Sequence, residues 1–175
     1  MYWYVLFVLT GQEQKVKQIL GKQLNGNLFQ PFVPLHEQIF RSLGTVNKEL
    51  KPLFPGYVFI ESEVSVQEFI NSISTIIYNS NDIVRVLKYC DKEIAIRESE
   101  KRMLLNLCNE NYCVELSSGI IKGDRIYVTS GPLKGYESII KKINRHKRLA
   151  WIEVEFLGHI KQVSVPLEIV ERSHI

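Results

Sequence analysis

Residues 151–156 read Trp-Ile-Glu-Val-Glu-Phe, the clearest alternation of apolar and charged residues in the chain. Successive side chains of a β-strand point to opposite faces, so Ile152, Val154 and Phe156 share one face, and the two carboxylates lie with the tryptophan on the other. The stretch therefore predicts a strand with one buried face. It also sets the character of the C-terminal third of the chain.

The residues around this strand repeat a short β-pattern and show no helical period from residue 119 onward. The other expected strands cover residues 125–128, 138–143 and 162–165, with a last apolar patch at 167–170. A module of this size has only a small core, and closing its sheet into a barrel removes the exposed strand edges. We therefore predict a small five-stranded β-barrel over residues 119–175.

The start of the chain predicts a strand followed by an amphipathic helix. Residues 3–8 are mainly β-branched and aromatic, which is typical of a central strand. Thr10-Gly11-Gln12-Glu13 has the form of a capping box, whose Thr and Glu side chains can satisfy the first helical N–H groups. We expect a helix to begin just after Thr10 and to end at Gly26. Its predicted buried stripe consists of Val16, Ile19, Leu20 and Leu24.

The next segment predicts an edge strand and a hairpin. Pro31 and Pro34 interrupt the apolar residues 29–41, and proline within a sheet is confined to edges and bulges. The polar segment 42–52 is expected to form the tip of a long hairpin. The chain would then return through residues 53–61.

Two more helices and one strand complete the N-terminal part. Ser65-Val66-Gln67-Glu68 is a second capping box and opens an amphipathic helix. A short strand is expected at residues 83–87 and a third helix near residues 98–108. Together these elements predict an α+β fold in which helices cover an antiparallel sheet. The expected domains are residues 1–110 and 119–175. They are joined by a linker at residues 111–118, whose apolar residues follow neither the helical nor the strand period.

Positive charge is concentrated at the C-terminal end. Residues 1–112 hold 12 Lys/Arg and 12 Asp/Glu, whereas residues 113–175 hold 10 and 7 and carry the whole net charge of +3. Within residues 141–148, five cations stand close together with one histidine between them. We call Lys141, Lys142, Arg145, His146, Lys147 and Arg148 the basic cluster. Such density favours a phosphate-binding surface over an ordinary solvated face.

Composition and residue spacing argue against several other classes. With 45% apolar and 23% charged residues, the chain has the make-up of a packed soluble protein. Its cysteines are Cys90, Cys108 and Cys113, and its histidines are His36, His146, His159 and His174. These positions form no CxxC pair and no metal-ligand spacing, so we predict no metal, no disulfide framework and no cofactor.

The sequence also lacks the patterns of a secreted protein, of a membrane protein and of several enzyme classes. The apolar run at residues 2–9 lacks a basic n-region and a small-residue cleavage site, and no stretch approaches a membrane-spanning length. We therefore expect a cytoplasmic protein with no membrane partner. The sequence also lacks a Gly-rich phosphate loop, HExxH and GxSxG, so we do not expect an enzyme.

Two groups of motifs resemble the NusG family of transcription elongation factors. The first is Trp3-Tyr4-Val5 with Thr10-Gly11-Gln12-Glu13 and Leu53-Phe54-Pro55-Gly56-Tyr57-Val58-Phe59, which is similar to the family's N-terminal (NGN) domain. The second runs from Lys122-Gly123-Asp124-Arg125 to Gly131-Pro132-Leu133-Lys134-Gly135-Tyr136 and resembles the KOW motif, which implies an SH3-like barrel. Within the family, the chain resembles the LoaP subgroup, specialised paralogs that act as antiterminators.

The resemblance implies that the N-terminal domain binds the clamp helices of RNA polymerase through an aromatic-rich pocket. The matching positions are Trp3, Phe54 and Tyr57. The Tyr57 hydroxyl suits a half-solvated interface, whereas Trp3 and Phe54 fit a strand core equally well. The KOW glycines Gly123, Gly131 and Gly135 are expected at turns with positive φ. Where many family members have another glycine, this chain has Ser138.

Two functions from different classes remain open. In the first, the barrel binds structured RNA in a leader hairpin, and the chain is an RNA-recruited processive antiterminator. The expected RNA-binding residues are the basic cluster together with Lys122, Arg125, Lys134 and Lys161. In the second, the chain is a general elongation or pausing factor whose barrel contacts other transcription or ribosomal proteins. In both, we expect a monomer.

Overall fold

The computed structural model describes residues 1–170, which form two compact units. Unit 1 comprises Met1–Pro34, Phe54–Lys101 and Phe156–Gly158, and unit 2 comprises Leu35–Leu53, Arg102–Glu155 and the chain from His159 on. Each unit therefore draws on segments that are far apart in the sequence. Along residues 1–170, no helix is both long and apolar enough to cross a membrane.

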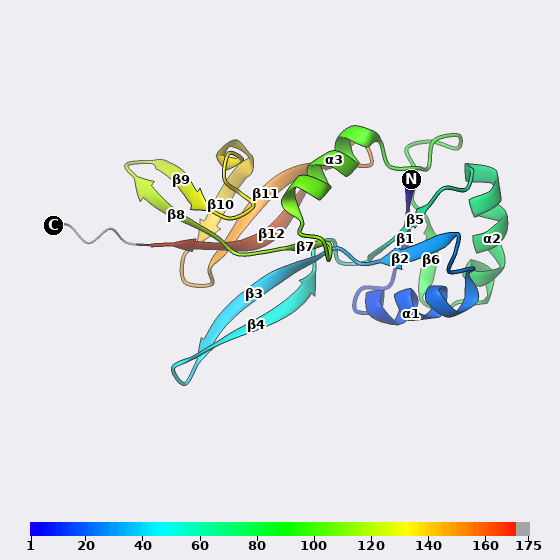
Figure 1. Ribbon diagram of the computed structural model, residues 1–175, viewed down its shortest axis with the longest axis horizontal. Coiled ribbons are helices and arrows are strands. Elements are labelled where there is room, and N and C mark those ends of the chain that lie inside the picture. The colour runs from blue at the N-terminus through cyan, green and yellow to red at the C-terminus, as the bar shows by residue number, and fades with distance from the viewer. Residues whose placement is uncertain (171–175) are drawn as a thin grey trace. The chain divides into compact units, whose positions relative to one another are not determined.

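Unit 1 is built on a four-stranded antiparallel sheet in the order β2-β5-β1-β6 (Figure 1). Strand β1 (Tyr2–Val8) pairs with β5 (Tyr57–Ser62) on one side and with β6 (Ile83–Val86) on the other. Strand β2 (Phe29–Phe32), which contains a proline, lies at the edge beside β5, as predicted. The four residues from Trp3 to Leu6 are at most 1% exposed, which confirms a central β1.

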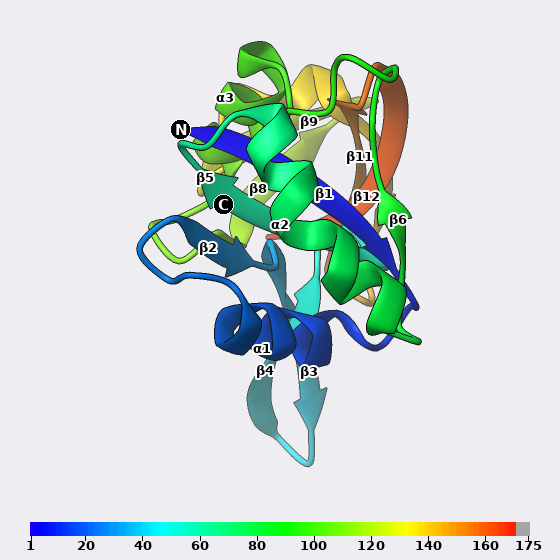
Figure 2. The same cartoon turned by 90° about the vertical axis from the view of Figure 1, so that its right-hand side faces the viewer.

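Two helices pack on unit 1. Helix α2 (Val66–Asn79) lies in front of β1 in Figure 2, and its Phe69 ring stacks on Tyr4 with 4.1 Å between centroids. Helix α1 (Glu13–Gln23) buries Val16 and Leu20. Ser65 caps α2 as predicted, because its Oγ accepts a hydrogen bond from the Glu68 N–H at 3.2 Å.

The predicted capping box at α1 is wrong. The N-cap is Gln12, and its side chain makes no capping bond. The carboxylate of Glu13 instead accepts hydrogen bonds from the N–H of Gly11, at 3.0 and 3.1 Å, and from the N–H of Gly56, at 2.8 Å. This glutamate therefore makes a local bond to Gly11 in place of the expected capping bond, and adds a tertiary contact to Gly56.

The predicted hairpin tip at residues 42–52 is also wrong. Strand β3 (Leu35–Ser42) pairs along its whole length with β4 (Thr45–Pro52), and together they form a long two-stranded arm of unit 2 (Figure 1). The turn is only Leu43-Gly44, both with positive φ, as a two-residue hairpin requires. The short strand β7 (Cys113–Val114) adds to β3 in parallel.

The rest of unit 2 contains five strands in the order β10-β11-β12-β8-β9. Their bounds are Ser117–Lys122 for β8, Arg125–Ser130 for β9, Ile140–Asn144 for β10, Leu149–Phe156 for β11 and His159–Ile169 for β12. A 3-10 turn at Glu137–Ile139 precedes β10. The alternation in β11 is confirmed, since Ile152 and Val154 are buried. The predicted α+β fold with a five-stranded SH3-like barrel is thereby confirmed.

Glycines shape the barrel as the sequence predicts. Gly123, Gly131 and Gly135 have φ of 58°, 96° and 86°. At Gly131 an added Cβ would lie only 2.5 Å from the Cα of Ser117, so two backbone segments approach closely there. Strand β8 was not predicted, because its first residues look like a polar linker.

Helix α3 (Glu98–Leu107) was predicted with nearly the same bounds, and it buries Leu104 and Leu107. Its residues up to Lys101 belong to unit 1, and those from Arg102 on belong to unit 2. The segment 111–118, expected as a linker, holds β7 and the first two residues of β8.

Candidate nucleic-acid interface

The basic cluster lies on the turn between β10 and β11 in unit 2. Backbone hydrogen bonds shape this turn: the Lys147 N–H donates to Asn144 Oδ1 at 2.9 Å, and the Arg148 N–H donates to the Arg145 carbonyl at 3.3 Å. Arg148 has a φ of 53°, an uncommon value for a residue with a side chain. Arg145, His146 and Lys147 are exposed at the tip, so their side chains can meet a partner in solution.

The two lysines of β10 are held close to the strand surface. The Lys141 ammonium donates to the Ser138 carbonyl at 3.2 Å and lies 4.0 Å from Glu153 Oε2. The Lys142 ammonium lies 5.2 Å from the centroid of the Trp151 ring, within cation–π range. Both side chains are exposed, so these weak contacts leave them available to an anion.

Arg148 differs from the rest of the cluster because it is partly buried and paired. Its side chain is 20% exposed, and its Nε lies 3.6 Å from Glu168 Oε1 on β12. The same Glu168 oxygen lies 4.0 Å from the guanidinium of Arg41 on β3. One carboxylate therefore faces two arginines, one on strand β3 and one on the β10–β11 turn. The sequence did not indicate Arg41 as a site residue, because nothing local links β3 to this turn.

The other predicted RNA-binding residues lie on different parts of the barrel. Lys122 and Arg125 face each other across the β8–β9 turn, where the Lys122 ammonium lies 5.8 Å from the Tyr127 ring centroid. Lys134 follows Gly131 in the loop before β10, and Lys161 lies on β12. Because β9 and β10 stand at opposite ends of the strand order, the β8–β9 turn does not adjoin the basic cluster through strand pairing.

The aromatic residues expected to contact polymerase lie in unit 1. Tyr57 is half-buried, and its ring lies 5.9 Å from Phe7 and 6.2 Å from Phe54 between centroids. Phe54 is only 1% exposed, because the ring of Phe156 stacks on it. Trp3 is likewise 1% exposed. Of the three, Tyr57 alone offers accessible ring surface.

Trp3 is fixed inside the sheet of unit 1. Its indole N–H donates to Glu61 Oε2 at 2.8 Å, and its ring makes edge contacts with Phe32 and Phe59 at 5.1 and 5.9 Å between centroids. The Lys101 ammonium lies 5.4 Å from the ring centroid. These contacts are those of a core aromatic residue.

The segment 156–158 of unit 1 is anchored by a buried carboxylate that the sequence did not indicate. Glu100 is 2% exposed and accepts hydrogen bonds from the N–H groups of Leu157 and Gly158, both at 2.9 Å. It also accepts one from the Tyr89 hydroxyl. Burial, and the hydrogen bond to Glu100, raise the pKa of Tyr89, which stays protonated and keeps donating.

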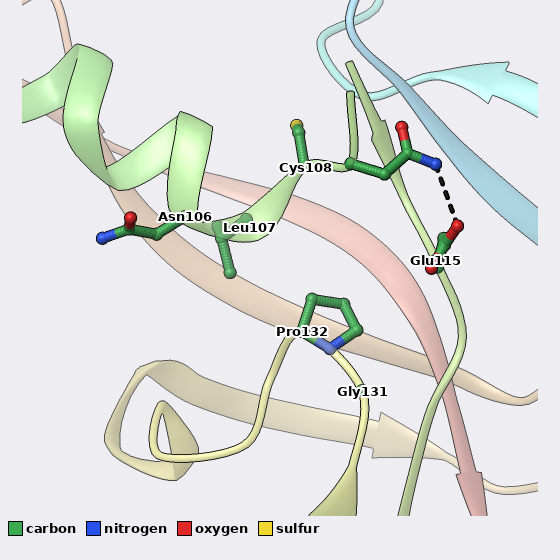
Figure 3. Close-up of a pocket in the computed structure, with 7 residues that line it drawn as sticks. Asn106, Leu107, Cys108, Glu115, Gly131 and Pro132 are labelled. Atoms are coloured by element: carbon green, nitrogen blue, oxygen red, sulfur yellow. Dashed lines mark hydrogen bonds between the residues drawn. The ribbon is translucent and has the colours of Figure 1, made fainter. Parts of the chain in front are cut away.

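A small pocket of about 250 Å³ in unit 2 lies beside the end of α3 (Figure 3). It is lined in part by Cys108, Glu115 and Pro132, and the Asn109 amide donates to Glu115 at 2.9 Å. Burial raises the pKa of the Cys108 thiol to about 12, so this cysteine is protonated and a poor nucleophile at neutral pH. Within residues 1–170, no three His, Cys, Asp or Glu side chains are grouped to hold a metal ion. His174 lies outside the described residues.

Comparison with known proteins gives two family matches and several relatives. A family model described as "Transcription termination factor nusG" matches residues 1–105, and a KOW motif model matches residues 122–155. "Transcription termination/antitermination protein NusG" of Thermus thermophilus is 26% identical over 165 residues, which cover 89% of this chain and 90% of the relative. The proteins of the same name from Haemophilus influenzae and Borreliella burgdorferi are 23% and 22% identical, and cover 98% and 97% of this chain and 94% and 97% of their own lengths.

Proposed function

The chain belongs to the NusG family of transcription termination/antitermination factors, and on that premise we propose that it is a processive antiterminator. Residues 1–110 bind RNA polymerase, and the KOW barrel of residues 119–175 binds a structured leader RNA. The described part of that barrel ends at residue 170. Residues 111–118 join the two domains.

The observation that supports RNA binding is the basic cluster on the β10–β11 turn. Arg145, His146 and Lys147 project from its tip, and Lys141 and Lys142 are exposed on the adjoining strand. Phosphate contacts from Lys and Arg suit an RNA hairpin, because the deep groove of A-form RNA hides its bases and leaves backbone and shape to be read. Lys122, Arg125, Lys134 and Lys161, on other parts of the barrel, are assigned as further RNA contacts.

The polymerase contact is assigned to the aromatic face of residues 1–110. Tyr57 is half-buried and supplies the accessible ring, which packs against Phe7 with 5.9 Å between centroids. Phe54 lies beside it at 6.2 Å between centroids, and Trp3 belongs to the same aromatic core. An apolar ring with a polar tip is well suited to the clamp helices of polymerase, where one edge of the contact stays wet.

The polymerase site and the RNA site belong to one chain, so a modest affinity at each site is enough for the whole complex to form. Once one site is bound, the other acts at an effective concentration set by the connecting segment, so the combined affinity exceeds that of either site alone. The proposal involves no catalysis, no cofactor and no membrane partner. It describes a cytoplasmic monomer acting on the nascent transcript.

A purified transcription reaction tests this proposal. We expect readthrough of a terminator to rise on adding the chain, and only on templates that encode an upstream RNA hairpin. Neutralising the five cations of the basic cluster should remove the effect. Tyr57→Ala should also reduce it by weakening polymerase binding. Equal readthrough with and without the hairpin would refute recruitment by RNA.

A general elongation or pausing factor is the second candidate, and the exposed apolar side chains of the barrel favour it. Ile160 is 69% exposed, and Tyr127 and Ile121 are 44% and 41% exposed, which suits contact with another protein. Gel-shift titrations of the full chain against an RNA hairpin library, over a salt series, separate the two candidates. RNA binding that survives neutralisation of the whole basic cluster would remove the assigned RNA surface and favour the second candidate.

A further inference from the structure

A hollow of about 520 Å³ lies between strand β3 and the basic cluster, with both walls in unit 2. One wall is formed by residues 38–41 of β3 and the other by residues 146–149 at the β10–β11 turn. Its size falls in the range of pockets that hold small ligands. It is large enough for one nucleotide and too small for a duplex.

The lining of the hollow is strongly positive. Arg41, Lys147 and Arg148 contribute positive charges, and none of the eight lining residues is acidic. The nearest paired carboxylate is that of Glu168, which faces Arg41 at 4.0 Å and Arg148 at 3.6 Å. Glu168 thus occupies the position where the guanidinium groups of β3 and of the β10–β11 turn converge. A phosphate can accept hydrogen bonds from the same two guanidinium groups, because two of its oxygens can pair with the N–H groups of one arginine.

The side chains of the two arginines differ in exposure in a way that suits ligand entry. The side chain of Arg148 is only 20% exposed, and its backbone carbonyl accepts a hydrogen bond from the Leu167 N–H at 3.0 Å. The side chain of Arg41 is 60% exposed and can turn toward a phosphate at little cost. Arg148 therefore supplies a fixed charge, and Arg41 supplies one that can close over the ligand.

The hollow also offers apolar surface beside its charges. Ile39 and Leu149 are buried lining residues, and Phe40, which also lines the hollow, is 42% exposed. An exposed aromatic ring next to phosphate-binding arginines is the combination on which unpaired bases stack. The paired part of an RNA stem keeps its bases stacked on one another and would not use the exposed ring.

We propose that this hollow binds one unpaired nucleotide of the RNA, with its phosphate between Arg41 and Arg148 and its base against Phe40. The proposal rests on the proposed function, because it assigns the class of RNA that the basic cluster binds: a stem carrying a bulged or looped-out residue. Strand β3 then contributes to recognition from outside the KOW motif. Glu168 competes with the phosphate and must release the arginines when RNA binds.

Fluorescence anisotropy with the full chain tests this assignment. The two probes are a fluorescein-labelled RNA stem-loop with one looped-out nucleotide and the same stem-loop with that nucleotide deleted. We expect Phe40→Ser to weaken binding of the bulged probe about tenfold and to leave the other probe nearly unchanged. Arg41→Gln should weaken the bulged probe and lower its salt slope by about 0.7, the value for one single-strand phosphate. Arg102→Gln, an exposed charge of unit 2 on α3, is the matched control and should behave as wild type.

The Glu168→Gln variant distinguishes an effect on the binding site from an effect on folding. It removes the carboxylate that competes for the two arginines, so we expect the bulged probe to bind several-fold more tightly, a gain that misfolding does not produce. Equal binding of both probes by wild type would overturn the nucleotide site. So would Arg41→Gln and Phe40→Ser variants that match Arg102→Gln. If RNA binding is then still lost on neutralising the basic cluster, the proposed function stands alone. Wild type that binds neither probe overturns both.

Discussion

The ring of Phe156 stacks on the ring of Phe54 inside unit 1, with 4.7 Å between centroids and 20° between the ring planes. Phe156 is 3% exposed, so its removal leaves a cavity against Phe54. We expect Phe156→Ala to lower the free energy of unfolding of unit 1 by about 3 kcal/mol.

Urea unfolding followed by Trp3 fluorescence, in a Trp151→Phe background, measures this loss, because the chain has only these two tryptophans. Tyr78→Ala removes an 88% exposed ring of unit 1 and is the control, with an expected change within about 0.5 kcal/mol. A Phe156 variant as stable as this control would mean that the stack does not form in solution.

Glu13→Gln should destabilise unit 1 by about 2 kcal/mol, since the buried carboxylate accepts charge-assisted bonds from Gly11 and Gly56 and its replacement leaves a donor without a partner. The same unfolding experiment checks this. Glu63 is exposed, so Glu63→Gln is the matched control. Equal stability of the two variants would contradict the assigned role of Glu13.

Two glycine substitutions in unit 2 should lower the free energy of unfolding by different amounts, because the two sites differ in free space. Gly135→Ala meets nothing within 4 Å and carries only the strain of φ 86°, about 1 kcal/mol. Gly131→Ala has φ 96° and also places Cβ 2.5 Å from the Cα of Ser117, so it should cost about 3 kcal/mol or more. Unfolding followed by Trp151 fluorescence, with Trp3 replaced by Phe, would rank them. An equal loss for both variants would argue against the close approach at Gly131.

Stability should fall in mild acid because of His36. Burial lowers the pKa of this imidazole below its ordinary value of 6.5, and the charge of Lys51 adds to the effect. As the pH falls through about 6.5, the unfolded chain takes up the proton before the folded one does, so stability present above that pH is lost. Urea unfolding at a series of pH values should show a flatter profile for His36→Gln. Parallel profiles for the two proteins would show that His36 does not contribute.

The three cysteines should react at different rates with iodoacetamide at mildly alkaline pH. Cys90 is exposed, whereas burial raises the pKa of Cys108 to about 12 and also raises the pKa of Cys113. Because the thiolate is the reactive form, we expect Cys90 to be modified first. Mass spectrometry of the digested protein measures this order, and urea should equalise the three sites. Rapid labelling of Cys108 in the folded chain would contradict the raised pKa of its thiol.

Local signals explain the elements that were predicted correctly. Ser65 caps α2 through a bond only three residues away, and the alternation of residues 151–156 is visible without any partner strand. Strand β4 escaped prediction because all eight of its residues are at least partly exposed, so it has no apolar face. Strand β8 was not predicted from the sequence, because Gly119 within it is typical of a loop. In the fold it allows close approach, since a Cβ there would lie 2.7 Å from the Tyr127 carbonyl.

The candidate site likewise has one part that local sequence predicts and one part that depends on tertiary contacts. The basic cluster is contiguous in sequence, so its position on a hairpin turn could be predicted. Its neighbours could not, because Glu168 meets Arg148 and Arg41 only through tertiary contacts between segments far apart in the chain. Likewise, the burial of Phe54 depends on Phe156, which lies about a hundred residues further along. Long-range contacts decide which side chains of a predicted site are accessible.

The buried carboxylate of Glu13 has a consequence for how sequences of this kind can diverge. It joins the Thr10-Gly11 segment to the Pro55-Gly56 segment, and Gly56, at φ 87°, leaves only 3.2 Å between a Cβ and the Val8 carbonyl. A change at any one of positions 11, 13 and 56 alters what the other two must satisfy. Substitutions at these three positions are therefore expected to be coupled, although the two motifs lie more than forty residues apart.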